Sequence, residues 1–143
     1  MLRLVIDTNI WIRILLRGRV TLPILTIWQA NQFQLVTSQP LLNEYNHVWQ
    51  RSRLQKYIDP QQAEKLYRQM RTRGEIVELQ TIPPRCRDPK DHPVLATAID
   101  GRANAIITGD DDLRADEELR KAMGEYGVLF WGVQSLLDAL ANE

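Results

Sequence analysis

The sequence has few of the features that mark a secreted or membrane protein. Cys86 is the only cysteine among 143 residues, so no internal disulfide can form, and a reducing cytoplasm is expected. No apolar run approaches the roughly 20 residues that cross a bilayer. The apolar N-terminal stretch is interrupted by Asp7 after a few residues, which is too short for a signal peptide. These absences predict a single cytoplasmic domain over residues 1–143.

Acidic residues are unevenly distributed, although the formal net charge is zero. None occurs between Ile10 and Asn43, and the segment 51–73 holds seven basic residues against two acidic ones. The segment 110–118 reverses this, with six acidic residues and one arginine. Basic flanks around an acidic centre suit a phosphodiester backbone. The alternative, which charge alone favours, is a set of solvated helix faces.

Short apolar runs alternate with segments of helical periodicity. The runs predict strands over 2–6, 33–36, 76–79, 105–108 and 128–131. Apolar residues at helical spacing predict helices over 10–15, 23–28, 40–49, 60–73, 93–100 and 133–140, and a charged helix over 117–123. Ser38 and Asp59 are predicted N-caps, and the proline-rich stretch 81–93 is predicted to be a loop. This alternation predicts an α/β fold with a parallel sheet covered on both faces.

Four acids occupy the beginning or end of a predicted element. Asp7 follows the first strand, Glu44 lies early in a helix, Asp91 precedes the Pro93 helix, and Asp110 follows the 105–108 strand. The carboxyl ends of neighbouring parallel strands meet at one sheet edge, where ligands bind. Gathered carboxylates repel one another unless cations or protons neutralise them. Oxygen ligands without a cysteine or histidine pattern favour Mg²⁺ or Mn²⁺ over zinc.

Each of these acids also has a purely structural explanation. An aspartate at a strand end commonly forms a turn or caps a helix, which applies to Asp7, Asp88 and Asp91. Glu44 taken alone is typical of an exposed helix surface. The run of three aspartates from Asp110 is typical of a solvated turn. The positional agreement of the acids favours function over any one of these explanations.

Three segments together resemble the PIN-domain family: Val-Ile-Asp-Thr-Asn-Ile (5–10), Cys-Arg-Asp-Pro-Lys-Asp (86–91) and Ile-Ile-Thr-Gly-Asp-Asp-Asp-Leu (106–113). They are most similar to its branch of toxins from toxin–antitoxin systems, the VapC-like ribonucleases. The resemblance implies a three-layer α/β/α sandwich with a central five-stranded parallel sheet. It also implies cleavage of single-stranded RNA that depends on Mg²⁺ or Mn²⁺ and leaves 5′-phosphate and 3′-hydroxyl ends.

The family's four acids match Asp7, Glu44, Asp91 and Asp110 in this sequence, and Asp112 is a candidate additional metal ligand. Asn9 and Thr108 match polar residues that support these ligands. Arg13 and Arg51, with Arg17 and Arg53 as alternatives, are candidates to bind flanking phosphates. His92 departs from the family pattern, which often has an acid or an amide there; beside Pro93 it is interpreted as a helix-capping residue.

Two other functions are compatible with the same fold. A non-catalytic module would bind RNA or a protein, but anionic residues at its centre would not help it bind RNA. A phosphohydrolase with an aspartyl nucleophile at Asp7 would need an acid at position 9, which is Asn9. The predicted partners are a cognate antitoxin and a second copy of the chain. Trp11, Trp28 and Trp49 are expected to lie mostly in the core, and any exposed remainder of them is a candidate groove for either partner.

Overall fold

The structure is a computed structural model that describes residues 1–142. Its strands are β1 (Arg3–Ile6), β2 (Gln34–Thr37), β3 (Glu75–Ile76), β4 (Ala105–Ile107) and β5 (Leu129–Trp131). Its helices are α1 (Thr8–Leu15), α2 (Leu22–Gln29), α3 (Gln39–Trp49), α4 (Pro60–Arg73), the 3-10 turn η1 (Pro89–Asp91), α5 (His92–Asp100), α6 (Asp111–Ala115), α7 (Glu117–Gly124) and α8 (Val133–Ala141). The predicted alternation of strands and helices is confirmed.

The five strands form one parallel sheet in the order β3-β2-β1-β4-β5. The chain moves outward from β1 through β2 to β3 and then returns to the other side of β1 with β4. The strand order therefore reverses between β1 and β4. In open parallel sheets, ligands bind outside the carboxyl ends of the strands at such a reversal.

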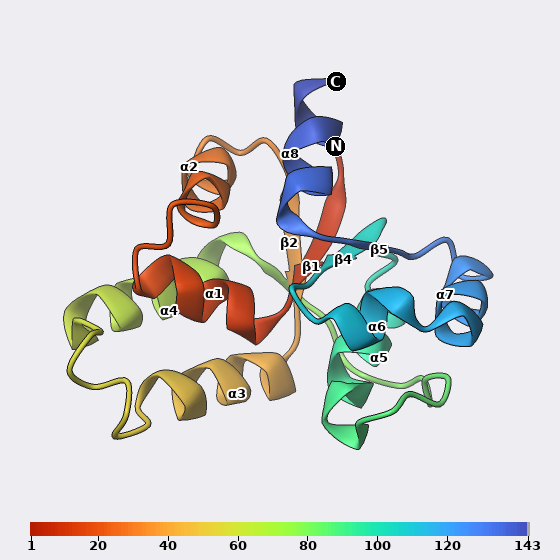
Figure 1. The fold of residues 1–143 in the computed structure, drawn as a ribbon, viewed down its shortest axis with the longest axis horizontal. Coiled ribbons are helices and arrows are strands. Elements are labelled where there is room, and N and C mark those ends of the chain that lie inside the picture. Colours follow the sequence, from red (N-terminus) through yellow and green to blue (C-terminus); the bar gives the residue numbers. More distant parts are fainter. Residues whose placement is uncertain (143) are drawn as a thin grey trace.

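The sheet separates two hydrophobic cores because successive side chains of a strand point to opposite faces. On β1, Leu4 and Ile6 join the core beneath α1, α2, α3, α4 and α8, whereas Val5 joins the core beneath α5, α6 and α7. Figure 1 shows the strands between these two groups of helices. The predicted fold class, a three-layer α/β/α sandwich with a five-stranded parallel sheet, is confirmed.

Local details differ from the sequence-based expectations. β3 is a two-residue edge strand, shorter than the predicted 76–79, because the chain leaves the sheet after pairing with the end of β2. The short helix α6 was not predicted. Ser38 occupies the N-cap position of α3, but its hydroxyl hydrogen-bonds the Thr97 hydroxyl at 2.8 Å and caps no backbone group. Asp59 does cap α4, accepting from Gln61 N at 2.9 Å.

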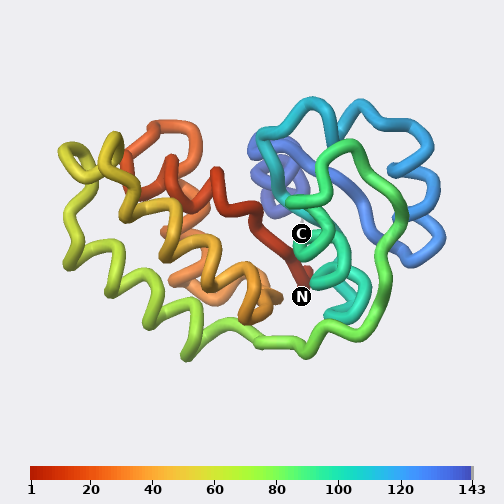
Figure 2. The backbone as a smooth tube through the Cα atoms, turned by 90° about the horizontal axis from the view of Figure 1, so that it is seen from below, coloured from red at the N-terminus to blue at the C-terminus, as the bar shows by residue number. Residues whose placement is uncertain are grey.

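The segment between β3 and η1 joins the two halves of the molecule and leads to Asp91. Figure 2 shows it (green) running outside α5. The Asp100 carboxylate of α5 accepts hydrogen bonds from the backbone N–H groups of Gln80 and Thr81, at 2.7 and 3.1 Å. These bonds attach the segment to α5 in the absence of regular secondary structure.

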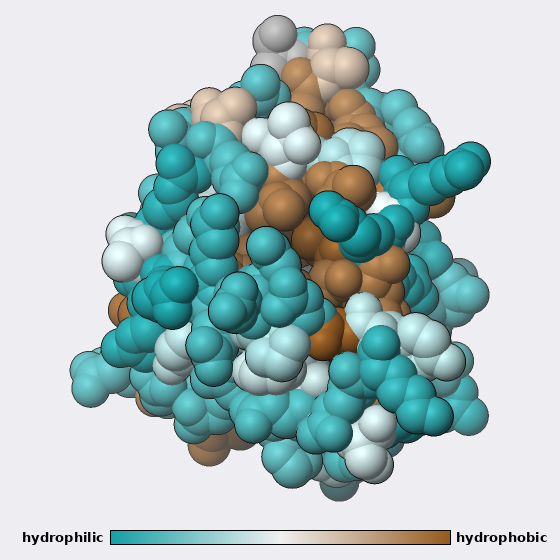
Figure 3. Space-filling view, turned by 90° about the vertical axis from the view of Figure 1, so that its left-hand side faces the viewer, coloured by the Kyte–Doolittle hydropathy of each residue, from teal (hydrophilic) through white to brown (hydrophobic). Residues whose placement is uncertain are grey.

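A groove lined by both apolar and polar residues lies between α1, α2 and α4, with Ile14, Leu25 and Leu66 among its apolar lining residues. Figure 3 shows the apolar area among hydrophilic side chains on this side of the molecule. The expectation that the tryptophans of α1, α2 and α3 lie mostly in the core is confirmed, since they are at most 9% exposed, and the groove expected from an exposed remainder is wrong. Among the described helices, none is long and apolar enough to cross a membrane.

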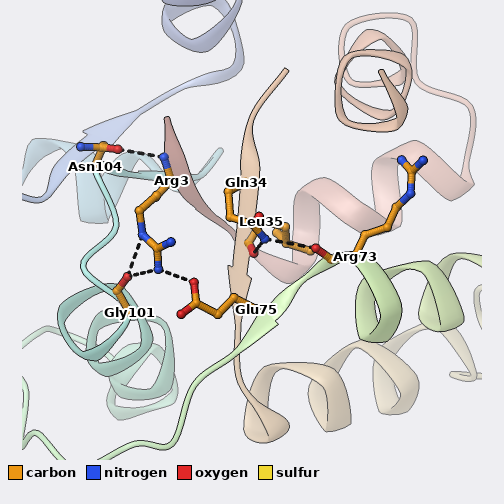
Figure 4. A network of polar contacts seen from close by, with 7 residues as sticks. All are labelled: Arg3, Gln34, Leu35, Arg73, Glu75, Gly101 and Asn104. Atoms are coloured by element: carbon orange, nitrogen blue, oxygen red, sulfur yellow. Dashed lines mark hydrogen bonds and ion pairs between the residues drawn. The ribbon is translucent and has the colours of Figure 1, made fainter. Parts of the chain in front are cut away.

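A polar network joins elements at the amino-terminal end of the sheet, opposite Asp7 (Figure 4). The Arg3 guanidinium donates from Nε and Nη2 to the Gly101 carbonyl oxygen at 3.2 and 2.6 Å, and Nη2 also pairs with Glu75 at 2.5 Å. Gly101 lies against β2, where an added Cβ would be 2.2 Å from a Val36 methyl group. The network therefore fixes β1, β3 and the end of α5 together.

We predict that Arg3→Met lowers the free energy of unfolding by about 1 kcal/mol, because the half-buried Gly101 carbonyl loses a charged donor. The exposed ion pair contributes less, so Glu75→Gln should cost under about 0.5 kcal/mol. Urea denaturation of both variants measures the difference. Equal losses would contradict the assignment of the main effect to Gly101.

Candidate active site

Pairing between β1 and β4 sets the positions of the first two acids. Ile6 pairs with Ile107, and the Asp7 backbone N–H extends the pairing by donating to the Ile107 carbonyl at 2.9 Å. The Asp7 side chain is only 8% exposed. Asp110 follows β4 at the same edge of the sheet. The sequence-based expectation that these acids share the carboxyl edge is therefore met at the reversal of strand order.

The buried Thr108 hydroxyl connects the two acids. It donates to Asp7 Oδ2 at 2.9 Å and accepts from the Asp110 backbone N–H at 3.0 Å. Asp110 Oδ1 in turn accepts from the Asp112 backbone N–H at 2.9 Å, which caps the short helix α6. One carboxylate oxygen of Asp110 therefore caps a helix, which is the purely structural role expected for an aspartate at a strand end. Thr108 fixes both acids in the way that an outer-shell group orients metal ligands.

Glu44 reaches the same edge from the second turn of α3. Its Oε2 accepts a hydrogen bond from the buried Thr8 hydroxyl at 3.0 Å. Thr8 begins α1 directly after Asp7, so one turn of chain positions two acids. Thr8 is not among the predicted site residues. Its position directly after the strand-end acid is a possible signal, but a hydroxyl residue at such a position more commonly starts a helix.

Asp91 lies at the N-terminus of α5, and the neighbouring Asp88 makes the local turn. Asp88 accepts from the Lys90 backbone N–H at 3.0 Å, whereas the Asp91 side chain makes no capping bond. The Asp91 carboxylate is thus available for another role. Asp91 occupies the N-cap position and His92 is the first residue of the helix, so the interpretation of His92 as the cap is wrong.

The pKa values show that the four acids influence one another. Partial burial raises the pKa of Asp91 to about 6, and the negative charges of Asp7, Asp110, Asp88 and Glu44 add to the rise. Burial likewise raises the pKa of Asp7, to which Glu44 and Asp110 contribute, while the Thr108 hydrogen bond opposes the rise. The fold therefore gathers distant carboxylates where their charges repel.

The donor chemistry of this cluster suits a hard divalent cation such as Mg²⁺, which takes oxygen ligands. Within the part of the chain that the structure describes, no three acidic, histidine or cysteine side chains are close enough to bind one metal ion together. Mg²⁺ usually retains several waters and binds one or two carboxylates directly. The cluster therefore fits a hydrated ion, with some carboxylates acting through water.

Three other predicted site residues, Asp112, Asn9 and Arg51, are exposed. Asp112 is exposed on α6 and pairs with Arg87 at 3.3 Å, and it does not contribute to the raised pKa of Asp7 or Asp91. Asn9 is exposed in the first turn of α1. Arg51 is exposed just beyond the C-terminal end of α3.

An acid cluster at the strand reversal of a three-layer parallel α/β domain defines a class of site suited to a hydrated divalent cation and a phosphate substrate. Comparison with known families matches residues 3–112 to the PIN domain. The chain belongs to the PIN-domain family, whose members are generally nucleases that use divalent metals. No curated protein and no solved structure is significantly similar to the chain.

We predict that Asp91→Asn stabilises the metal-free protein at pH 7.5. Because the folded-state pKa is raised, ionisation of Asp91 removes stability as pH rises from about 4 through about 6. After allowance for solvent screening, the gain is about 1 kcal/mol, or roughly 3 °C in Tm. Thermal unfolding in EDTA measures it, and the gain should become small as the pH falls below about 3.5, where the carboxyl group is mostly protonated in both states.

Asp59→Asn is the matched control for this variant, since Asp59 is an exposed aspartate that caps α4 and is not one of the charges that raise the pKa of Asp91. It should show no stabilisation at pH 7.5. Added Mg²⁺ should raise the Tm of the wild type more than that of Asp91→Asn. A higher Tm for the wild type than for Asp91→Asn, in EDTA at pH 7.5, would contradict the inferred repulsion among the carboxylates.

Proposed function

We propose that this protein is a metal-dependent endoribonuclease that hydrolyses phosphodiester bonds of single-stranded RNA. The observation that carries the proposal is the convergence of Asp7, Glu44, Asp91 and Asp110, with raised pKa values at Asp7 and Asp91. Uncompensated repulsion of this kind is costly for a fold and useful only when a cation is bound. Membership of the PIN-domain family supports nuclease chemistry, and the similarity of the three motifs to toxin sequences supports RNA as the substrate.

Each acid has a proposed part in the reaction. Asp7, Asp91 and Asp110 would hold Mg²⁺ or Mn²⁺, at least in part through water, and Glu44 would complete this set or help to hold a second ion. A divalent ion held there would supply an activated water and neutralise charge that develops on the phosphate. Thr108 and Thr8 keep Asp7 and Glu44 in their orientations. Hydrolysis forms a new P–O bond to the water oxygen, breaks the P–O3′ bond and transfers a proton to O3′.

We predict that Asp7→Asn lowers cleavage of a labelled single-stranded RNA by more than about 100-fold, because the most buried ligand loses its charge. Thr108→Val, which removes only the hydroxyl group, should lower it about 10- to 100-fold. Cleavage should stop in EDTA and return with Mg²⁺ or Mn²⁺. Circular dichroism verifies that both variants are folded.

The alternative function, a non-catalytic binding module, gives a different result in the same assay. Such a module would bind the RNA equally well in EDTA and cleave none of it with either metal. Cleavage by Asp7→Asn at the wild-type rate would also contradict the proposed nuclease site.

The proposed biological role is that of the toxin in a toxin–antitoxin pair. The groove between α1, α2 and α4 supports this role because its lining combines aliphatic side chains with two basic residues, Arg17 and Lys65, against one acid, Asp59. An amphipathic antitoxin helix with acidic residues beside its apolar face would complement that groove. A homodimer, also expected from the sequence, stays a prediction that light scattering of the purified chain tests.

We predict that expression of the wild-type chain arrests bacterial growth and that Asp7→Asn does not, since growth arrest requires RNA cleavage. Co-expression of the reading frame adjacent to this gene should restore growth. Viable-cell counts after induction measure both effects. Equal toxicity of the Asp7→Asn variant would contradict a nuclease toxin.

A further inference from the structure

Arg13 lies beside the acid cluster without pairing with it. It is exposed on α1, and within residues 1–142 its guanidinium forms no hydrogen bond or ion pair. The guanidinium rests against Gly109, where an added Cβ would be 2.7 Å from Nη1 and 3.2 Å from Cζ. Gly109 joins Thr108, which bonds Asp7, to Asp110. The Arg13 guanidinium therefore contacts the residue that directly precedes Asp110 and directly follows the Thr108 that bonds Asp7.

Such a guanidinium is suited to bind a phosphate group. Its planar set of N–H donors matches two oxygens of a phosphate, and charge-assisted bonds of this kind are short and strong. A polyanion that approaches the acid cluster is repelled by it, and a cation at the edge of the cluster offsets this repulsion. Asn9 precedes Arg13 by four residues and is also exposed, so the two side chains lie on one face of α1.

We propose that Arg13, supported on Gly109, binds a backbone phosphate of the RNA next to the phosphate that is cleaved, with Asn9 between Arg13 and the acids. This inference rests on the proposed nuclease function and selects one arginine that sequence analysis left among several. The small size of Gly109 is part of the site, because any side chain there would displace the guanidinium.

Several of the other arginines are engaged elsewhere, and Arg17, Arg51 and Arg53 lack the contact with Gly109. Arg71 lies over the Tyr67 ring and bonds Gln39, and Arg73 bonds main-chain carbonyls of α2. Arg114 of α6 pairs with an aspartate, and so does Arg87 in the segment before η1. Arg13 combines a free guanidinium with a position beside the acid cluster.

The test compares Arg13→Gln and Arg13→Lys in the cleavage of a labelled single-stranded RNA over a range of KCl concentrations. Arg13→Gln should lower kcat/KM about 10- to 100-fold, as expected for the loss of one charge-assisted bond. It should also reduce the slope of log kcat/KM against log salt by about 0.7, the value for one phosphate contact on a single strand. Arg13→Lys keeps the charge but not the planar fork, so it should retain the wild-type slope with an intermediate kcat/KM.

The matched control is Arg102→Gln, which removes the same charge from an exposed position before β4, at the opposite end of the sheet. It should leave both kcat/KM and the salt slope at wild-type values. An Arg13→Gln variant that matched this control would overturn the inference. The nuclease function would then still stand, since the wild type would still cleave RNA.

Gly109→Ala tests the position of the guanidinium without removing its charge. Its Cβ should displace Arg13 and lower kcat/KM, and the double variant with Arg13→Gln should be no slower than Arg13→Gln alone. Additive losses would overturn the proposed arrangement, because Gly109 would then act independently of Arg13.

Failure of the proposed function is recognised separately. If the wild type cleaves no RNA with Mg²⁺ or Mn²⁺, fluorescence anisotropy measures binding of the same RNA to Asp7→Asn, in which one repelling charge is absent. Weaker binding and a smaller salt slope after Arg13→Gln in this background would support the phosphate site. Unchanged binding would overturn it.

Discussion

The electrostatic repulsion among four carboxylates is the constraint on which the active-site architecture depends. Pairing of β1 with β4 brings Asp7 and Asp110 to one edge, and the Thr108 hydroxyl holds them in a fixed relation. Burial and neighbouring negative charges then raise the pKa of Asp7 and Asp91. A cation is the natural partner of such a cluster, because it replaces mutual repulsion with attraction to a shared positive charge.

The two ends of the sheet have opposite electrostatic character. At the amino-terminal end, Arg3 satisfies the Gly101 carbonyl and pairs with Glu75, so charges there are compensated within the fold. At the carboxyl end, the acids have hydroxyl and backbone donors but no arginine or lysine ion pair among the described residues, apart from the peripheral Asp112 and Asp111. Charges are thus compensated within the fold at one end of the sheet and left largely uncompensated at the other.

Hydroxyl groups adjacent to the acids orient two of the carboxylates. Thr8 and Thr108 each follow a central strand closely, and each donates to a carboxylate that comes from a distant segment or strand. A hydroxyl donor orients a carboxylate while leaving its net charge intact, whereas a lysine or arginine would neutralise it. The cluster therefore remains ordered and negatively charged, as cation binding requires.

The sequence by itself determined the fold class, the strand-end positions of Asp7 and Asp110 and the burial of the tryptophans, because hydrophobic periodicity is a local property of the chain. The grouping of Glu44 and Asp91 with these acids was a prediction from their positions and the family resemblance. Only the tertiary structure decided that Ser38 bonds Thr97 instead of capping α3. It also decided that Arg13 rests on Gly109. These contacts join segments that are distant in sequence, so strand order and packing fix them, and no local pattern encodes them.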